Sequence, residues 1–395
     1  MLLALIYNNF GPYHLARLAA TAGYGKNYGI EVMGIEIASQ ERRYAWEPES
    51  TAETKKLTIF PARAVEELSQ WELISGMWST LNRLNPQAMA FGPSGETLPA
   101  FLAMLAWARL RRRVALVMMD SKYDDFPRLR LKEFLKKRMF SLIDAALVGG
   151  TYSRDYAASL GLAAGRIFPG CDVVDNDYFA RKADWARENA AQGCNEFQLP
   201  EHYFLFVGRF DEKKNIFRLL EAYAHYLTLA PAPPWHLVLC GSGPLEQALR
   251  DKAREFKLPQ AHFAGFHQID TLPLYYGLAR CLVVPSSHNE QWGLVVNEAM
   301  ALGLPVLVSR ACGCVPDLVQ EGVNGYTFDP YDVEGLARLM LMMSSETIDL
   351  KAMGEASRRI IARWSPKTFA QHLLQAVEAG RAHRRRGPTG GLSGD

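Results

Sequence analysis

Residues 281–301 read Cys-Leu-Val-Val-Pro-Ser-Ser-His-Asn-Glu-Gln-Trp-Gly-Leu-Val-Val-Asn-Glu-Ala-Met-Ala, which is an apolar run, a polar turn and a second apolar run. The first run is short, rich in valine and closed by Pro285, a pattern that predicts a buried strand. Gly293, Leu294 and Val295 then open a helix. The amides of a first helical turn and the helix macrodipole favour an anionic ligand such as a diphosphate.

Two glutamates stand eight positions apart in this strand-turn-helix unit, Glu290 in the turn and Glu298 in the helix. With a step of about 100° per helical residue, Glu298 is expected to point toward the same crevice that Glu290 reaches from the loop. One carboxylate suits sugar hydroxyls and the other suits a ribose. Taken alone, such a pair is more often a solvated loop charge and a surface helix residue, so the neighbouring motifs must decide.

A second strand and turn lie in residues 203–216, which read Tyr-Phe-Leu-Phe-Val-Gly-Arg-Phe-Asp-Glu-Lys-Lys-Asn-Ile. Arg209 and Lys214 follow the apolar run and stand five positions apart. The planar fork of arginine and the compact ammonium of lysine can hold two phosphates and absorb the charge of a departing diphosphate. We regard Lys213 as a solubilising residue of the same turn.

A third strand enters a glycine-rich turn in residues 235–246, Trp-His-Leu-Val-Leu-Cys-Gly-Ser-Gly-Pro-Leu-Glu. Gly241 and Gly243 invite comparison with a dinucleotide-binding fingerprint. That fingerprint requires a third small residue where this chain has Glu246. An oxidoreductase of the Rossmann type is therefore not favoured.

Together these three segments resemble the retaining nucleotide-sugar glycosyltransferases of family four, the glycosyl transferases group 1. That family carries a Glu-(seven residues)-Glu element followed by Ala-Met-Ala, and a Gly-Arg-(four residues)-Lys loop. The resemblance implies that Glu290 contacts the donor sugar, Glu298 the ribose, and Arg209 with Lys214 the diphosphate. It also implies that the turn from Gly241 lies near the nucleotide base, although an ordinary tight turn remains the alternative.

The composition of the whole chain is that of a soluble globular protein. Its 395 residues are 49% hydrophobic and 22% charged, with a net charge of +2. The length predicts two domains, and the near-neutral charge argues against nucleic-acid binding. The start Met1–Tyr7 has no basic leader, and no apolar run reaches the 18 or so residues of a membrane span. Six scattered cysteines are expected to be reduced, so we predict a cytoplasmic protein.

Strands and helices alternate along the chain. Strands are expected near residues 1–7, 30–37, 88–92, 114–119, 145–148, 203–208, 235–240, 261–265, 281–285, 305–308 and 325–328, with helices such as 97–110 and 128–142. This alternation predicts an α/β fold with two Rossmann-like, doubly wound parallel-sheet domains. The family resemblance implies that the two domains face a cleft, the GT-B fold.

The expected domains are residues 1–180 for the acceptor and 181–364 for the nucleotide sugar. The resemblance implies that a helix over 365–380 returns to the first domain, and Ser365 with Pro366 suits its start. Residues 381–395 are expected to form a flexible tail.

The candidates on the acceptor side come from the first half of the chain. Gly11 follows the first strand and could approach the donor phosphates, while His14 could face the acceptor. Family members commonly place a histidine after the strand that here is Val114–Met119, but this chain continues with Asp120, Ser121 and Lys122. Asp120 is the candidate to orient an acceptor hydroxyl, and a helix cap or loop charge is its alternative role.

Basic residues concentrate between positions 109 and 138, and the later ones alternate with Leu129, Leu131, Phe134 and Leu135. Such a segment could contact an anionic membrane or a lipid pyrophosphate at the inner face of the membrane. A solvated helix face that covers the sheet remains the alternative.

The resemblance implies transfer of a sugar from a nucleoside diphosphate, with UDP as the expected nucleotide, to a hydroxyl of a saccharide, glycolipid or small molecule. Such a retaining hexosyltransferase would serve polysaccharide or glycoconjugate biosynthesis. No cofactor is expected, and acids and histidines are not grouped as metal ligands. A nucleotide-sugar 2-epimerase of similar fold and a non-catalytic nucleotide-sugar-binding assembly protein remain alternatives.

Overall fold

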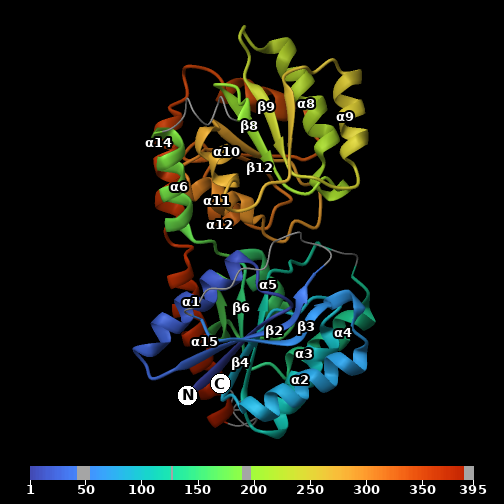
Figure 1. Ribbon diagram of the computed structural model, residues 1–395, viewed down its shortest axis with the longest axis vertical. Helices are drawn as coiled ribbons and strands as arrows, with labels where there is room; N and C mark the ends of the chain where they lie inside the picture. The colour runs from blue at the N-terminus through green and yellow to red at the C-terminus, as the bar shows by residue number, and fades with distance from the viewer. Residues whose placement is uncertain (42–53, 126–127, 189–196, 387–395) are drawn as a thin grey trace, which may run out of the picture. The chain divides into compact units, whose positions relative to one another are not determined.

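The computed structural model describes residues 1–41, 54–125, 128–188 and 197–386, and their contacts divide into two compact units. Unit 1 comprises the described residues within Met1–Val174 and Ser365–Asp395, and unit 2 comprises those within Asp175–Trp364. Each unit has one parallel β-sheet (Figure 1).

Unit 1 contains a seven-stranded sheet with the order β3-β2-β1-β4-β5-β6-β7, in which every pair of neighbours is parallel. Its strands are β1 (Leu2–Tyr7), β2 (Glu31–Gln40), β3 (Lys56–Ala64), β4 (Ala88–Phe91), β5 (Val114–Met119), β6 (Ala145–Val148) and β7 (Ile167–Pro169). Its helices are α1 (Pro12–Lys26), α2 (Gln70–Leu84), α3 (Leu98–Leu110), α4 (Arg130–Phe140), α5 (Thr151–Ser159) and α15 (Pro366–Arg386), with short 3₁₀ turns at Val65–Glu67 and Ala164–Arg166.

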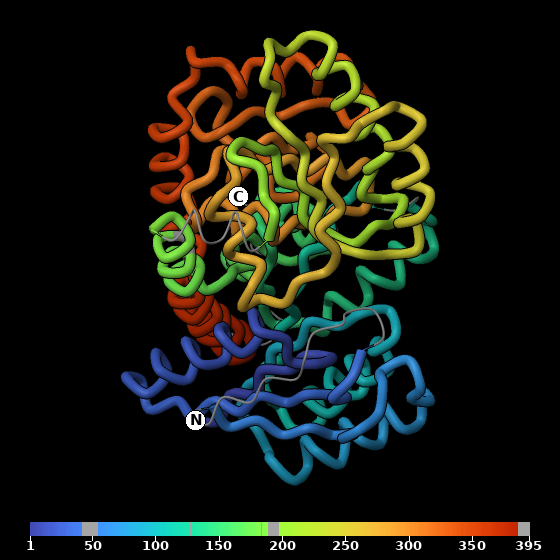
Figure 2. The backbone as a smooth tube through the Cα atoms, turned by 45° about the horizontal axis from the view of Figure 1, so that its top comes forward, coloured from blue at the N-terminus to red at the C-terminus, as the bar shows by residue number. Residues whose placement is uncertain are grey.

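The central strands of this sheet are buried on both faces. Ala4 and Ile6 of β1 share one core cluster with Phe101 of α3 and Phe140 of α4. Because side chains alternate along a strand, the buried Leu5 points to the opposite face. Helix α15 packs there beside α1 and along β5, β6 and β7, as the red and blue helices in Figure 2 show.

Unit 2 contains a six-stranded parallel sheet with the order β10-β9-β8-β11-β12-β13. Its strands are β8 (Tyr203–Val207), β9 (His236–Cys240), β10 (Ala261–Gly265), β11 (Cys281–Val284), β12 (Val306–Ser309) and β13 (Gly325–Phe328). Its helices are α6 (Asn176–Glu188), α8 (Ile216–Leu229), α9 (Glu246–Glu255), α10 (Leu272–Leu278), α11 (Leu294–Ala301), α12 (Val315–Leu318), α13 (Val333–Met343) and α14 (Leu350–Ile361), and a 3₁₀ turn spans Glu212–Lys214.

The two sheets share one strand topology, in which the first strand of each unit is the third in the sheet and the strand order reverses beside it. The reversal lies between β1 and β4 in unit 1 and between β8 and β11 in unit 2. In open parallel sheets ligands bind at the carboxyl ends of the strands next to such a reversal. The fold therefore indicates one candidate ligand-binding edge in the sheet of each unit.

Two expected boundaries differ from the observed ones. The boundary expected after residue 180 falls inside α6, which packs against α10 and α11 and belongs to unit 2. The tail expected from residue 381 is helical as far as Arg386, and residues 387–395 lie outside the described part. Both segments are polar and lack a clear apolar periodicity, so the sequence did not predict that they are helical. Tertiary packing stabilises these helical segments instead.

Five cysteines, at positions 171, 240, 281, 312 and 314, are buried free thiols, and Cys194 lies outside the described residues. Within residues 1–41, 54–125, 128–188 and 197–386, no helix combines the length and the apolar character needed to cross a bilayer.

Candidate functional site

The candidate site of unit 2 lies at the carboxyl ends of β8, β9 and β11, where the strand order reverses. Lys214 follows β8, Gly241 follows β9, and Glu290 follows β11. Parallel strands end at the same edge of a sheet, so three segments far apart in the sequence converge there. The sequence predicted that each of these three residues follows a strand. The observed strand order makes the three loops neighbours.

The loop that carries Lys214 is tied down on both sides. Asp211 accepts a hydrogen bond from the Lys214 backbone amide, which closes the short 3₁₀ turn. Asn215 adopts a left-handed conformation with a φ of 57°, and its side-chain amide donates to the carbonyl oxygens of Pro285 and Pro330 at 3.0 and 2.8 Å. The β8 loop is thereby fastened to the loop that follows β11.

Lys214 and Glu290 form a buried ion pair across these two loops. The Lys214 Nζ lies 2.5 Å from Glu290 Oε2, and the Ser286 hydroxyl donates to the same oxygen at 2.9 Å. Both charged side chains are largely buried, with 12% and 9% of their surfaces exposed. Buried charges persist when they are paired and hydrogen-bonded.

Opposing electrostatic effects keep this pair ionised. Burial alone would raise the pKa of Glu290, but the charges of Lys214 and Lys213 and two hydrogen bonds lower it below its usual range. Burial likewise opposes the charge of Lys214, yet attraction and hydrogen bonding to Glu290 raise the pKa of this lysine. The edge of the sheet thus holds one fixed cation and one fixed anion side by side.

Two glycines allow the β8 and β9 loops to touch backbone to backbone. A Cβ atom on Gly241, whose φ is 145°, would lie 1.9 Å from the Gly208 carbonyl oxygen. A Cβ atom on Gly243 would lie 2.5 Å from the Phe210 carbonyl oxygen. These positions exclude side chains, and Arg209, between Gly208 and Phe210, is left exposed on the loop.

Helix α11 begins immediately beside Glu290. Gly293 precedes it in a left-handed conformation with a φ of 101°, and the Val296 amide closes the first turn onto the Gly293 carbonyl. Leu294 and Val295 are the first residues of the helix, where backbone amides point out of the helix end. This geometry is suited to an anion.

Glu298 is more deeply placed than the sequence indicated. It is only 2% exposed, and the Tyr276 hydroxyl on α10 donates to Glu298 Oε2 at 2.7 Å. The alternative of a surface helix residue is therefore wrong. The carboxylate is held inside unit 2 by a partner that sequence analysis did not identify.

A further loop braces Glu290 from the end of β12. The Gly313 amide donates to the Glu290 carbonyl at 3.0 Å, and the Cys314 amide donates to the Trp292 carbonyl at 3.2 Å. A Cβ atom on Gly313 would lie 1.7 Å from the Gln291 carbonyl oxygen, so only glycine permits this approach. No motif of the sequence analysis predicted this contact between the β12 loop and the Glu290 loop.

Unit 1 gathers a second polar cluster at the carboxyl edge of its own sheet. Arg17 of α1 is buried, donates to the Val173 carbonyl at 3.0 and 3.2 Å, and lies 3.8 Å from Asp172. Burial and the nearby charge of Asp172 raise the pKa of Asp120 to about 7, although Arg17 opposes the shift. Asp120 was predicted from the sequence, whereas Arg17 and Asp172 were not, because no local motif indicates them.

The other candidates of unit 1 are engaged within the unit. The Gly11 amide donates to His14 Nδ1 at 3.2 Å, which places the imidazole proton on Nε2. Burial and Arg17 lower the pKa of His14 to about 3, so its ring is neutral. Lys122 is buried and contacts the Asp124 and Asp125 carboxylates at 2.8 and 3.4 Å. Among the candidates of unit 1, Asp120 is the carboxylate whose pKa is raised to about 7.

Among the described residues, no group of three or more histidines, cysteines and acids is arranged to hold a metal ion.

Comparison with known proteins adds to this geometry. Residues 192–360 match the sequence model of a family described as Glycosyl transferases group 1. The chain is 30% identical to a D-inositol 3-phosphate glycosyltransferase of Corynebacterium kroppenstedtii over 54% of this chain and 47% of that protein. The chain therefore spans about half the length of this curated relative.

Solved structures resemble nearly the whole chain. HepE from Anabaena, crystallised with UDP, aligns with a TM-score of 0.70 and 16% identity over 96% of this chain and all of HepE. Sucrose-phosphate synthase from Thermosynechococcus elongatus aligns with a TM-score of 0.73 and 19% identity over 96% and 99% of the two chains. The two parallel-sheet units were predicted from the alternation of strands and helices, and they are those of the GT-B fold, which the family resemblance implied.

Proposed function

We propose, from the premise that residues 192–360 belong to the glycosyl transferases group 1, that this protein is a retaining glycosyltransferase. Its donor is a nucleoside-diphosphate hexose, with UDP as the nucleotide. Its acceptor is a hydroxyl group of a saccharide, a glycolipid or a small molecule. The observation that carries the proposal is the buried Lys214–Glu290 pair at the strand reversal inside the matched segment.

This pair supplies the two charges that a nucleotide sugar requires. In the proposed donor complex, the Lys214 ammonium turns from Glu290 toward the diphosphate, and the Glu290 carboxylate accepts hydrogen bonds from sugar hydroxyls. Arg209 and the first-turn amides of Leu294 and Val295 add positive potential on the diphosphate. The Glu298 carboxylate is assigned to the ribose, and the turn at Gly241 to the base.

The proposed reaction breaks the bond between the anomeric carbon and the diphosphate oxygen and forms a bond to the acceptor oxygen. The acceptor proton passes to the departing diphosphate. Catalysis then consists of positioning and of stabilising the growing negative charge, for which Lys214 and Arg209 are suited. No resident cofactor is invoked, and Asp120 is proposed to orient the acceptor hydroxyl.

UDP is preferred as the nucleotide because HepE, whose fold this chain shares, was solved with UDP. Inositol-type polyols belong among the acceptors to be tested, because a relative is named a D-inositol 3-phosphate glycosyltransferase. A place of action in the cytoplasm is supported by the five buried free thiols, which suit a reducing compartment.

The test is a thermal-shift screen of nucleotide sugars, followed by a transfer assay with each donor that binds. We expect at least one UDP-sugar to raise the melting temperature and to give a glycosylated product with retained anomeric configuration. Glu290→Gln should bind the nucleotide and lose most of its turnover. If no nucleotide sugar binds, the proposal fails. Release of UDP together with a sugar inverted at C2, without acceptor, would instead identify an epimerase.

A further inference from the structure

Helix α3 exposes an apolar stripe instead of a polar outer face. Leu98, Leu102, Ala106 and Leu110 follow one another at four-residue intervals, and all four are exposed. Leu110 is 72% exposed. A surface helix normally turns charged or polar residues outward and keeps its apolar residues for the core. The outer stripe of α3 is thus a surface that the described part of the chain does not cover.

Helix α4 repeats this inverted arrangement. Leu131, Phe134 and Leu135 are 70%, 59% and 58% exposed and lie on one face at helical spacing. Phe140 is the residue of α4 that is buried in the core of unit 1. The apolar face of α4 therefore points outward.

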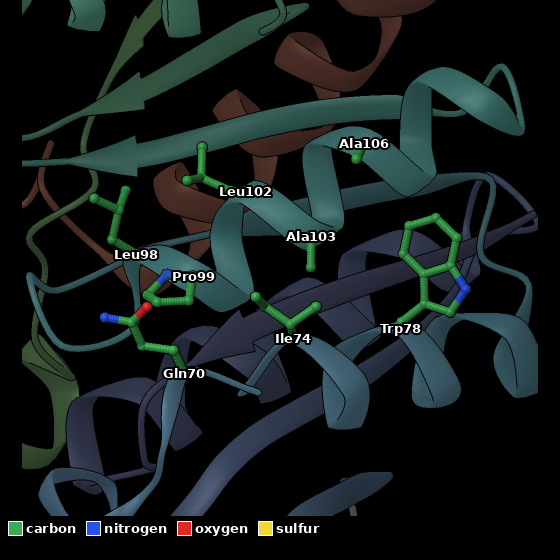
Figure 3. A pocket seen from close by; sticks show the side chains of 8 residues that line it. All are labelled: Gln70, Ile74, Trp78, Leu98, Pro99, Leu102, Ala103 and Ala106. Atoms are coloured by element: carbon green, nitrogen blue, oxygen red, sulfur yellow. The ribbon is translucent and has the colours of Figure 1, made fainter. Parts of the chain in front are cut away.

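Helices α2 and α3 enclose a groove that extends this apolar surface. The groove has a volume of about 510 Å³ and is lined by Gln70, Ile74, Trp78, Leu98, Pro99, Leu102, Ala103 and Ala106. Figure 3 shows Ala103 of α3 directed toward Ile74 of α2. Gln70 is the polar residue of this lining, so the groove is suited to aliphatic groups.

The three helices cover the same face of the unit 1 sheet, because residues of all three contribute to one core cluster (Figure 1). Nine of the eighteen exposed large hydrophobic side chains in the described residues lie on or next to them, so exposed apolar area is concentrated here. We call this the α2–α3–α4 surface, whose exposed apolar residues are Trp71, Leu98, Leu102, Leu110, Leu129, Leu131, Phe134, Leu135 and Leu142.

The exposed charges of α3 and α4 are mainly positive, whereas α2 carries Glu72, which pairs with Arg63. Arg130, Lys132, Lys137 and Arg138 of α4 are exposed among the apolar residues, and Arg111 and Arg112 are exposed where α3 ends. Glu133 is the one acidic residue of α3 and α4, and it pairs with Arg128 and Lys136. Protein interfaces are depleted in lysine, whereas apolar residues interleaved with lysine and arginine are typical of helices that lie on anionic membranes.

We propose that the α2–α3–α4 surface docks on an anionic lipid bilayer. The apolar side chains of α3 and α4 enter the boundary between headgroups and acyl chains, and the exposed cations bind lipid phosphates. This docking goes beyond the proposed sugar transfer, because it concerns a surface that the donor site of unit 2 does not use.

The test is flotation of the full chain with vesicles of phosphatidylcholine, alone or mixed with phosphatidylglycerol. We expect co-flotation with the mixed vesicles and release by high salt, since exposed charges are screened. Leu131→Ser with Phe134→Ser should reduce binding at least tenfold. Lys137→Gln with Arg138→Gln should reduce it roughly fivefold for each lost cation.

Matched variants keep the test specific. Leu229→Ser removes an exposed leucine of unit 2, and Lys351→Gln with Arg359→Gln removes two exposed cations there, so these variants should float like the unaltered protein. Circular dichroism confirms that each variant is folded. Equal binding to both vesicles, no binding to either, or full binding by the Leu131 and Phe134 variant would overturn the proposal. A concentration-dependent dimer that buries this surface in place of lipid would also overturn it. None of these outcomes affects nucleotide-sugar binding, which is measured separately.

Discussion

The residue on which the proposed donor site depends most is Lys214, because it neutralises the buried Glu290 carboxylate in the structure without ligand. Lys214→Ala removes both the proposed contact to the diphosphate and the partner of Glu290. We expect the UDP affinity to fall about tenfold or more, since a charged hydrogen bond contributes about 1.5–3 kcal/mol. Stability should fall by about 3 kcal/mol, because an unpaired charge stays buried.

Isothermal titration with UDP and thermal denaturation measure both effects of this substitution. Lys213→Ala is the matched control, because it removes one positive charge from the same loop, whereas the hydrogen bonds to the Glu290 carboxylate come from Lys214 and Ser286. It should leave UDP affinity within about threefold of the original. An alanine at position 214 that binds UDP as tightly as lysine would refute the role of the pair.

A second prediction at the residue scale concerns Asp120 and pH. Its folded pKa of about 7 lies above the ordinary value of 3.8, so the folded protein holds this proton more tightly than the unfolded chain does. Stability from this group is therefore complete below pH 4 and is lost as the pH rises toward 7. Asp120→Asn should leave stability unchanged at pH 4 and raise it by about 1–3 kcal/mol at pH 8.

Thermal denaturation of Asp120→Asn and of the original protein between pH 4 and pH 8 measures this difference in stability. A constant difference for Asp120→Asn would show that Asp120 titrates as an ordinary carboxylate.

At the scale of elements, the loops after β8 and β9 depend on a contact that only glycine allows. Gly241→Ala would place a Cβ atom 1.9 Å from the Gly208 carbonyl oxygen, so the two loops must separate. We expect a loss of about 3 kcal/mol or more and weaker nucleotide binding. Gly23→Ala in α1, where the new methyl group meets nothing within 4 Å beyond its chain neighbours and the backbone of its own helix, should instead stabilise the protein by about 0.5–1 kcal/mol. Thermal denaturation should show a lower stability for Gly241→Ala and a higher stability for Gly23→Ala.

The elements that could be predicted from sequence are those whose own residues form a clear apolar pattern. Strands such as Val114–Met119 and Cys281–Val284 are buried on both faces and read as continuous apolar runs. Strand β3 was missed because it lies at the sheet edge, contains Pro61 and is largely uncovered. Strand β7 was missed because it has only three residues.

Part of the candidate site could be predicted from the sequence, and part could not. Lys214 and Glu290 follow recognisable strands, so their convergence at one edge follows from the sheet order. The bond from Tyr276 to Glu298 could not be predicted, because it joins α10 to α11 across 22 positions without a repeating pattern. Arg17 and Asp172 are 155 positions apart and meet only when α1 packs beside the end of β7.

At the scale of the whole molecule, helix α15 belongs to unit 1 although the segment of unit 2 precedes it in the chain. Phe369, Leu373 and Val377 are completely buried, and fully burying each such side chain contributes about 1.5–3 kcal/mol. A chain that stops at Trp364 should therefore lose the unfolding transition of unit 1 and retain that of unit 2.

Calorimetry resolves these two transitions, with Leu373→Ala as an intermediate case that should lower the stability of unit 1 by about 2–5 kcal/mol. If the shortened chain keeps both transitions, α15 is not a structural part of unit 1.

The position of α15 also sets an order of events on the ribosome. Unit 2 is one continuous stretch, so it can fold as soon as it has been made, whereas the nascent unit 1 must wait for a helix translated about 190 residues later. During that interval the sheet face destined for α15 is uncovered. Newborn chains of this protein should therefore require chaperone protection for their first half, even though it is synthesised first.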